Sequence, residues 1–419
     1  MFTNIKKTDE AFENREGIEA RILNGEVVVM REALQTFDCM TMLDDAACIG
    51  IEKSQGKAAA ERARRDGFHR IHEWVTAEDI PAMTDAVYDE VRPLAAEFLR
   101  KFVPGMFPGV NSYYYEQTPN VRFHIPYDIA AAHKKEFNKF GKHHGQGKIT
   151  AHGPHRDSWL DCPSNGINLW FAIGRIQPGN GLTVFTEDYA SRASYQSSGN
   201  ISDGEKLHKA QSFDLHPGDV VLFHTDHVHG SELNRLNETR FAISFRMSFD
   251  KPQFQNLHYH PYVYSNWENA PALSQLPALA QPSYARSLVS RAVNKFFPST
   301  TPKEPAAKDA EIIGQKSGDT IRVSLTEVPV GTVRGISAAL CVARLNETDV
   351  VAMTRRCPHQ GGDLVNGWID GENVVCPWHN LPFCTKEGRS DCSSLPQLKR
   401  VRAEIADAEI IVHPQERIG

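Results

Sequence analysis

Two cysteines and two histidines near the C-terminus constrain the fold of this chain more than any other feature of its sequence. Cys357 and His359 stand in one short segment, Cys376 and His379 stand in a second, and residues 360–375 separate them. Thiolates are soft, charged ligands for iron, and two imidazoles on the second iron reduce the negative charge of a [2Fe–2S] cluster. One cysteine and one histidine from each of two loops is the ligand set that such a cluster requires.

A zinc site is the alternative interpretation of these four residues. Zinc accepts the same side chains, but zinc fingers usually pair cysteine with cysteine and histidine with histidine along the chain. Here each segment carries one of each, in the order C-x-H and then C-x-x-H. Gly361 and Gly362 also allow the first loop to turn tightly beside a cluster. The pattern therefore favours iron and sulfide over zinc.

Residues 311–419, which contain both segments, resemble the Rieske family. Residues 395–398 and 408–412 are similar to the closing strands of that family. High-potential members carry an extra cysteine in each cluster loop, whereas Trp378 stands at that place in the second loop of this chain. The resemblance therefore implies a small all-β domain of the ferredoxin and oxygenase type, with a [2Fe–2S] cluster on the four residues above.

A second group of metal-binding residue types lies in the middle of the chain. His155 and Asp157 alternate, and alternate residues of a strand point to the same face, so both can reach one metal ion. His229 would complete a set of two imidazoles and one carboxylate. This set leaves three positions open on Fe(II), enough for a chelating cosubstrate and O2. His224 and His227 lie close to His229 in the sequence, and we expect them to have structural or supporting roles.

Residues 60–250 resemble phytanoyl-CoA dioxygenase-like enzymes, which are Fe(II)/2-oxoglutarate oxygenases. In that family an arginine after the distal histidine binds the far carboxylate of 2-oxoglutarate, and here Arg240 stands eleven residues after His229 (240 − 229 = 11). The planar fork of an arginine suits a carboxylate. The resemblance also implies that Asn168 and Thr183 contribute to binding the cosubstrate.

The rest of the pattern predicts helices first and strands afterwards. Helical spacing of apolar residues indicates a long helix that begins at Thr76, whose hydroxyl would cap it. Short runs rich in β-branched and aromatic residues follow, separated by Gly, Pro, Asn and Asp. These runs are residues 112–115, 121–125, 167–173, 182–185, 219–223 and 241–249. Many short strands favour a double-stranded β-helix, or jelly roll, with helical flanks.

The predicted domain organisation is an oxygenase domain at residues 1–297, a linker at 298–310 and a Rieske domain at 311–419. Residues 298–307 are rich in Pro, Ser and Thr, a composition that is typical of linkers. The predicted fold class is therefore mainly β with helices, with an N-terminal jelly-roll oxygenase domain and a smaller all-β Rieske domain.

The composition excludes several other classes of protein. The net charge of −6 is mild, so we expect no nucleic-acid or membrane partner. The first residues lack the apolar stretch of a signal peptide, and no apolar run is long enough to span a bilayer. Eight cysteines in such a chain favour metal ligation over a disulfide framework. We expect a cytoplasmic protein, and the sequence is compatible with a homo-oligomer.

Together the two resemblances imply a 2-oxoglutarate-dependent dioxygenase that uses Fe(II) and O2 to hydroxylate a C–H bond of a small-molecule substrate. Since 2-oxoglutarate supplies the electrons for each productive turnover, we hypothesise that the cluster returns the mononuclear iron from Fe(III) to Fe(II). A ferredoxin reductase or another donor would supply those electrons. Residues 186–189 depart from the family turn that borders the pocket, so the resemblance does not name the substrate.

Two alternatives to this function stay open. In the first, the chain is an oxygenase of another class, in which the cluster feeds electrons into every turnover and 2-oxoglutarate is not used. In the second, the chain is a non-catalytic, redox-responsive binding module. Arg240 argues against the first alternative, and the complete ligand sets at both iron sites argue against the second.

Overall fold

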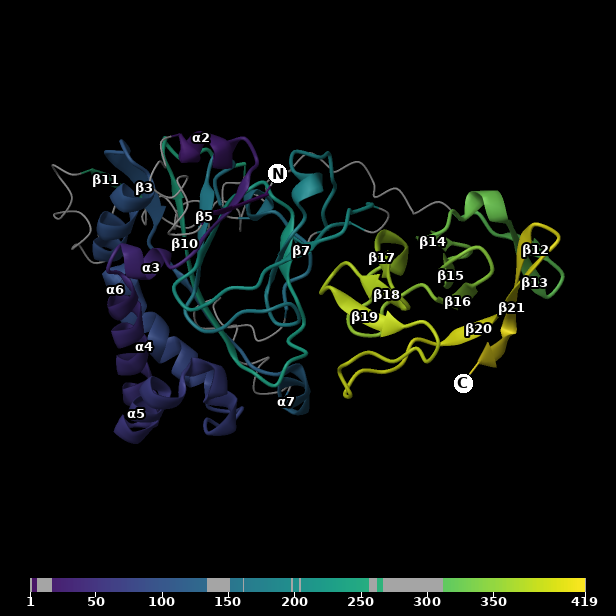
Figure 1. Ribbon diagram of the computed structural model, residues 1–419, viewed down its shortest axis with the longest axis horizontal. Coiled ribbons are helices and arrows are strands. Elements are labelled where there is room, and N and C mark those ends of the chain that lie inside the picture. The colour runs from purple at the N-terminus through teal and green to yellow at the C-terminus, as the bar shows by residue number, and fades with distance from the viewer. Residues whose placement is uncertain are drawn as a thin grey trace, which may run out of the picture.

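The chain forms a larger N-terminal body and a smaller C-terminal body. The computed structural model describes residues 2–5, 17–133, 151–160, 162–196, 199–202, 205–255, 262–266 and 312–418. The predicted linker at residues 298–310 lies outside these described residues. Figure 1 shows helices and strands in the larger body, and mainly strands in the smaller body, which begins with β12 (Gln315–Ser317).

The described part of the larger body contains α-helices of very different lengths. They are α2 (Ile18–Leu23), α3 (Ala33–Thr36), α4 (Met40–Gln55), α5 (Lys57–Asp66), α6 (Ile80–Met106) and α7 (Tyr127–Ala132). In Figure 1, α4, α5 and α6 lie on the side that faces away from the smaller body. These three helices therefore do not take part in the contact with the smaller body, whereas Asp128 of α7 accepts hydrogen bonds from Ser393 and Ser394.

The predicted start of the long helix is wrong by about one turn. The helix α6 begins at Ile80, four residues after Thr76 (80 − 76 = 4), with Asp79 at its N-cap position. The hydroxyl of Thr76 donates to the Asp79 carboxylate over 2.7 Å, and Thr76 lies three residues before the N-cap position (79 − 76 = 3). The helix then continues through Pro93 and Pro104, each of which removes one backbone donor.

A large sheet and a small sheet make up the β part of the larger body. The large sheet runs in the order β1-β2-β8-β5-β10-β3-β11, with β4 paired to β10, and the small sheet runs β7-β6-β9. Their bounds are β1 (Phe2–Ile5), β2 (Val27–Met30), β3 (Ser112–Glu116), β4 (Asn120–His124), β5 (Ile167–Ala172), β6 (Leu182–Val184), β7 (Gln211–Ser212), β8 (Val220–His224), β9 (His229–Ser231), β10 (Arg240–Ser248) and β11 (Tyr262–Asn266).

Aromatic packing joins α6 to the large sheet. The ring of Phe98 stacks on that of Phe245 at a centroid distance of 5.0 Å and meets the edge of Phe171 at 5.2 Å. Phe102 also contacts Phe171, at 4.9 Å. Because strand residues alternate between faces, this helix-facing set leaves the alternate residues of β5 and β10 on the opposite face.

The smaller body contains a seven-stranded sheet and a three-stranded sheet. The first runs β12-β13-β21-β20-β16-β15-β14 and the second runs β17-β18-β19. Their remaining bounds are β13 (Thr320–Ser324), β14 (Thr332–Gly335), β15 (Leu340–Arg344), β16 (Val350–Thr354), β17 (Trp368–Asp370), β18 (Asn373–Cys376), β19 (Leu381–Cys384), β20 (Arg400–Ala406) and β21 (Glu409–Ile418). The turn between β18 and β19 holds residues 377–380.

The predicted fold class, mainly β with helices and an all-β C-terminal part, is confirmed by these elements. The jelly-roll arrangement of the N-terminal part stays a prediction. Within the described ranges, no helix combines the length and the apolar character that crossing a membrane requires.

The contact between α6 and the sheet predicts a large effect of one substitution. Phe98→Ala should lower the free energy of unfolding by about 3–5 kcal/mol, because it leaves a cavity among buried rings. The control Ile49→Ala removes a side chain of α4 that is 43% exposed. It should change stability by no more than about 0.5 kcal/mol. Urea titration followed by circular dichroism measures both, and similar losses in the two variants would contradict the packing described.

Candidate functional site

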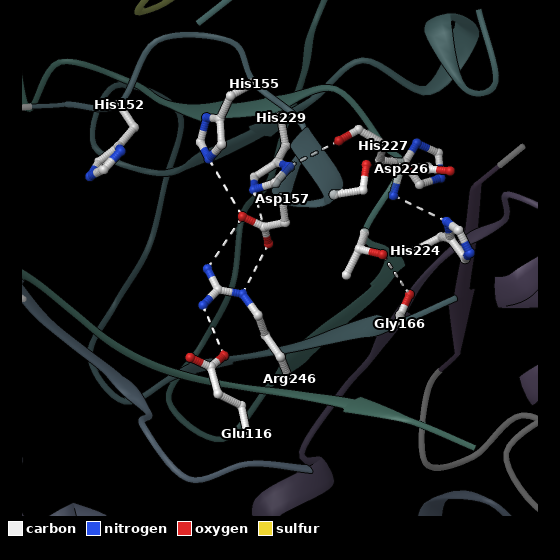
Figure 2. Close-up of polar contacts among 12 residues, drawn as sticks. Glu116, His152, His155, Asp157, Gly166, His224, Asp226, His227, His229 and Arg246 are labelled. Carbon is white, nitrogen blue, oxygen red and sulfur yellow. Dashed lines mark hydrogen bonds and ion pairs between the residues drawn. The ribbon is translucent and has the colours of Figure 1, made fainter. Parts of the chain in front are cut away.

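Three predicted ligands converge in the larger body. The metal-ligating atoms of His155, Asp157 and His229 all lie within 4.8 Å of one another. Nε2 of His155 is 3.7 Å from one carboxylate oxygen of Asp157, and Nε2 of His229 is 3.8 Å from the other. Figure 2 shows both imidazoles directed toward this carboxylate. The donor types and their convergence fit a facial site for Fe(II).

Backbone pairing places two of these ligands side by side. His155 and His229 form an isolated antiparallel bridge, in which the backbone N–H of each donates to the carbonyl of the other over 2.9 Å. Asp157 does not continue a strand but begins a 3-10 turn, Asp157–Trp159. The expectation that His155 and Asp157 alternate along one strand is therefore wrong. The turn, and not strand alternation, brings Asp157 to the two histidines.

Hydrogen bonds to carbonyls orient both imidazoles. Nδ1–H of His155 donates to the carbonyl of Gly153 over 2.7 Å, and Nδ1–H of His229 donates to that of His227 over 3.0 Å. These bonds fix the tautomers and leave Nε2 of each ring available to a metal. Burial and the nearby His229 lower the pKa of His155 to about 4, so its ring is neutral and can ligate at neutral pH.

Arg246 is a site residue that the sequence reasoning missed. Its Nε and Nη2 donate to the two oxygens of Asp157 over 3.0 and 3.3 Å, and its Nη1 donates to Glu116 over 3.1 Å (Figure 2). Burial alone would raise the pKa of Asp157, but Arg246 and the two imidazoles outweigh it and hold this pKa well below its ordinary value. The ion pair therefore keeps the carboxylate charged and fixes its orientation.

The three ligands open into a cavity that holds about 700 Å³ of empty space, including its open mouth. Alternate residues of β5 and β10 line it, as the strand period requires. These residues are Asn168, Trp170, Arg240, Ala242, Ser244 and Arg246. Two of the predicted cosubstrate residues, Asn168 and Arg240, thus lie on the cavity wall. The third, Thr183, is buried on β6, but its neighbour Leu182 represents that strand in the lining.

Two further guanidinium groups make the cavity wall positive. Nη1 of Arg240 donates to the carbonyls of Asn180 and Gly181 over 3.1 Å, while its Nε is buried without a hydrogen-bond partner among the described residues. Arg122 donates to Nε2 of His152 over 2.7 Å. Burial lowers the pKa of Arg240 to about 9 and that of Arg122 to about 10. An anionic ligand would stabilise such poorly solvated cations.

His224 and His227 lie outside the group that His155, Asp157 and His229 form. Nε2–H of His227 donates to the carbonyl of Gly25 over 3.2 Å. Nδ1 of His224 accepts from the backbone N–H of Asp226 over 3.1 Å. Figure 2 shows both rings on the far side of His229 from Asp157. Both residues hold the loop that precedes β9.

The four predicted cluster ligands lie together in the smaller body. Nδ1 of His359 and Nδ1 of His379 are 3.2 Å apart, and the thiols of Cys357 and Cys376 are hydrogen-bonded. Nε2–H of His379 donates to the carbonyl of Ala151 over 3.1 Å, so Nδ1 of this ring carries no proton and is available to iron. Paired thiols and paired imidazoles fit one iron each of a [2Fe–2S] cluster.

The loops around the cysteines are shaped for sulfur ligands. The backbone N–H groups of His359 and Gln360 point at Cys357 and lower the pKa of its thiol, as does the hydrogen bond from Cys376, which is the largest cause. A Cβ on Gly362 would lie 2.8 Å from the ring of Trp378 and 3.1 Å from the sulfur of Cys376. Only glycine therefore fits at this position of the first loop.

Two family models match the chain. The model for phytanoyl-CoA dioxygenase (PhyH) matches residues 128–242, and the model for the Rieske [2Fe-2S] domain matches residues 316–405. The first range contains the mononuclear ligand set and Arg240, and the second contains all four cluster ligands. The predicted fusion of a phytanoyl-CoA dioxygenase-like domain with a Rieske domain is thereby confirmed. None of the curated proteins compared matches the chain.

Solved structures are similar to part of the chain. The complex of reduced oxygenase and oxidized ferredoxin in carbazole 1,9a-dioxygenase is 24% identical, with 25% of this chain and 100% of that chain covered and a TM-score of 0.23. The Sphingomonas yanoikuyae B1 ferredoxin is 21% identical over 22% of this chain and 92% of that chain, with a TM-score of 0.20. Pseudomonas putida CBB5 NdmA with caffeine is 23% identical over 22% of this chain and 30% of that chain, with a TM-score of 0.19.

The ion pair at Asp157 predicts that Arg246→Lys weakens metal binding. Lysine keeps the positive charge but loses the fork that holds both carboxylate oxygens. We expect the affinity for Fe(II) to fall by about ten- to a hundredfold, the usual effect of losing a group that orients a ligand. Anaerobic calorimetry measures it. The control Arg322→Lys changes an exposed ion pair with Glu409 and should leave the affinity unchanged; an equal loss there would contradict the role of Arg246.

The cluster ligands predict that the purified protein is red-brown and gives a rhombic EPR signal after reduction. Changing Cys357 and Cys376 to Ser should abolish this signal. The matched control Cys384→Ser alters a half-buried thiol of β19 outside the ligand set and should retain it. Finding zinc, without iron and acid-labile sulfide, in anaerobic preparations would show that the cluster assignment is wrong.

Proposed function

We propose that this chain is a 2-oxoglutarate-dependent dioxygenase that hydroxylates a C–H bond of a small molecule. We further propose that its Rieske cluster keeps the mononuclear iron in the ferrous state. The observation that carries the proposal is that Arg240 shares one cavity with His155, Asp157 and His229. A metal face with open positions and a buried cation are the two partners that a chelating dicarboxylate needs.

Arg240 is suited to hold the far carboxylate of the cosubstrate. The carbonyls of Asn180 and Gly181 fix its guanidinium, which leaves the buried Nε as a donor to a ligand. Its guanidinium carbon also lies 5.9 Å from the centre of the Trp170 ring. A donor held in this way loses little entropy when the ligand binds, so the site is preorganised.

The bound iron would supply the oxygen chemistry, in which O2 and 2-oxoglutarate yield succinate and CO2 while one oxygen atom enters the substrate. The chain positions this chemistry through the fixed tautomers of His155 and His229 and through the grip of Arg246 on Asp157. Because Asp157 fills the carboxylate position, we expect a hydroxylated and not a halogenated product.

The first test measures 2-oxoglutarate directly. Anaerobic titration of the Fe(II) enzyme should produce the charge-transfer absorption of the chelate, and O2 should then yield succinate. Arg240→Leu should weaken 2-oxoglutarate binding by about 2–5 kcal/mol, the cost of removing one partner of a buried ionic hydrogen bond. The mononuclear iron and the [2Fe–2S] cluster should both remain bound. The control Arg122→Leu removes a second guanidinium of the cavity wall. If Arg122→Leu alone weakens 2-oxoglutarate binding, the cosubstrate is held by Arg122 and our assignment is wrong.

The second test separates iron repair from the alternative in which the cluster feeds every turnover. The variant with Cys357 and Cys376 changed to Ser, loaded with Fe(II), should form succinate in its first turnover, fade, and recover partly with ascorbate. The intact enzyme should be sustained by a ferredoxin reductase and NAD(P)H. If the folded, Fe(II)-loaded variant forms no succinate in its first turnover, the repair hypothesis fails. The hypothesis that the cluster feeds electrons into every turnover then replaces it.

A further inference from the structure

The smaller body contacts the larger one through a cluster ligand. Nε2–H of His379 donates to the carbonyl of Ala151 over 3.1 Å. The backbone carbonyl of the same residue accepts from the N–H of Leu233, also over 3.1 Å. His379, Ala151 and Leu233 are all nearly inaccessible to solvent, with exposed fractions of 1%, 5% and 1%. Ring and backbone of one cluster ligand are thus hydrogen-bonded to the other body in a contact that excludes water.

The first contacted segment leads to a ligand of the mononuclear site. Ala151 stands four residues before His155 (155 − 151 = 4). Between them, the carbonyl of Gly153 accepts from Nδ1–H of His155 over 2.7 Å. A continuous run of main chain, closed at each end by a hydrogen bond to an imidazole, therefore joins His379 to His155.

The second contacted segment leads to the other histidine ligand. Leu233 stands four residues after His229 (233 − 229 = 4). The backbone N–H of Ser231 donates to the carbonyl of His152 over 2.9 Å, which ties this segment to the first one. Both histidines of the mononuclear site are thus connected to the same cluster ligand through short stretches of main chain.

We propose that His379 and these two segments carry electrons from the cluster to the mononuclear iron within a single chain. One electron leaves the reduced cluster and converts Fe(III) to Fe(II); no bond is broken and no proton needs to move. NAD(P)H, acting through a reductase of the ferredoxin type, re-reduces the cluster. The inference rests on the proposed function, which identifies Fe(III) in the mononuclear site as the electron acceptor. It adds the path of the electron and the claim that donor and acceptor belong to the same chain.

Further polar contacts hold the two bodies in the position that this path requires. Nδ2 of Asn380, next to His379, donates to the buried carboxylate of Glu232 over 2.7 Å and to Ser212 over 3.0 Å. Arg235 pairs with Asp391 over 2.5 Å. Asn380 is therefore a positioning residue, which acts by fixing where His379 meets Ala151.

The first experiment asks whether the electron stays within the chain. Protein with Fe(III) in the mononuclear site is mixed anaerobically with dithionite, and loss of the ferric EPR signal is followed by rapid freeze-quenching. The variant lacking the cluster corrects for direct reduction. We expect a first-order rate that does not change across a dilution series. A mixture of cluster-free chains with chains that lack His155 and His229 should show no fast phase. A rate proportional to concentration, or recovery in the mixture, would overturn the proposal.

The second experiment tests the docking contact. Asn380→Asp is nearly isosteric but places a carboxylate against Glu232. If the like-charge contact lowers the docked population about tenfold, or ~1.4 kcal/mol, the transfer rate should fall by the same factor. The cluster spectrum and the first-turnover yield of Fe(II)-loaded enzyme should not change. The matched control Asn346→Asp makes the same change in an exposed turn, where the side chain accepts from Thr348, and should keep the full rate.

Hydrogen exchange at residues 151–155 reports whether the variant has undocked. An undocked variant with an unchanged transfer rate would overturn the proposed path. If Asn380→Asp stays docked, the additional change Arg235→Glu opposes Asp391 as well, and the dilution series still decides the proposal by itself. The proposed function fails separately: intramolecular reduction without succinate formation would retain the path and discard the 2-oxoglutarate reaction. Succinate formation with electron transfer between chains would retain the 2-oxoglutarate reaction and discard the path within one chain.

Discussion

The reciprocal backbone bridge between His155 and His229 is the contact on which the rest of the structure depends. It joins two segments that are distant in the sequence, and it sets two imidazoles side by side before any metal contributes. The same two segments continue to Ala151 and Leu233, where the smaller body docks. A disturbance of this bridge would therefore alter the ligand geometry and the domain contact together.

Charge is arranged around this bridge so that more cations than anions line the cavity: Arg240 is buried and Arg122 is half-buried. Asp157 and Glu116 are both paired with Arg246. Arg122 and Arg240 bind only neutral groups in the contacts described, namely the ring of His152 and two backbone carbonyls. A poorly solvated cation that has no carboxylate in hydrogen-bonding contact is costly, so such a cavity is suited to an anionic ligand. Under the proposed function, a dicarboxylate cosubstrate would pair with Arg240, and Arg122 would be left to face the substrate.

Local chemistry made several parts of the structure predictable. The strand expected at residues 167–173 corresponds to β5, and the strand expected at 241–249 corresponds to β10 within one residue at each end. Both were predictable because runs of β-branched and aromatic residues favour strands through local sequence alone. The helix start at Thr76 was wrong because the helix begins at Ile80, with Asp79 and not Thr76 at its N-cap position. Arg246 was missed, although the period of two from Arg240 along the same strand places it on the cavity face.

The docking contact was out of reach of such reasoning for a different reason. His379 binds the carbonyl of Ala151 and the N–H of Leu233, and every residue type other than proline offers both groups. Contacts made through the main chain place little constraint on residue identity. The sequence of these two segments therefore does not predict that His379 binds them. What the sequence does show is the two candidate ligand sets that these contacts connect. The proposed electron path would therefore persist while the residues along it change, provided that the bridge between His155 and His229 and its hydrogen bonds are kept.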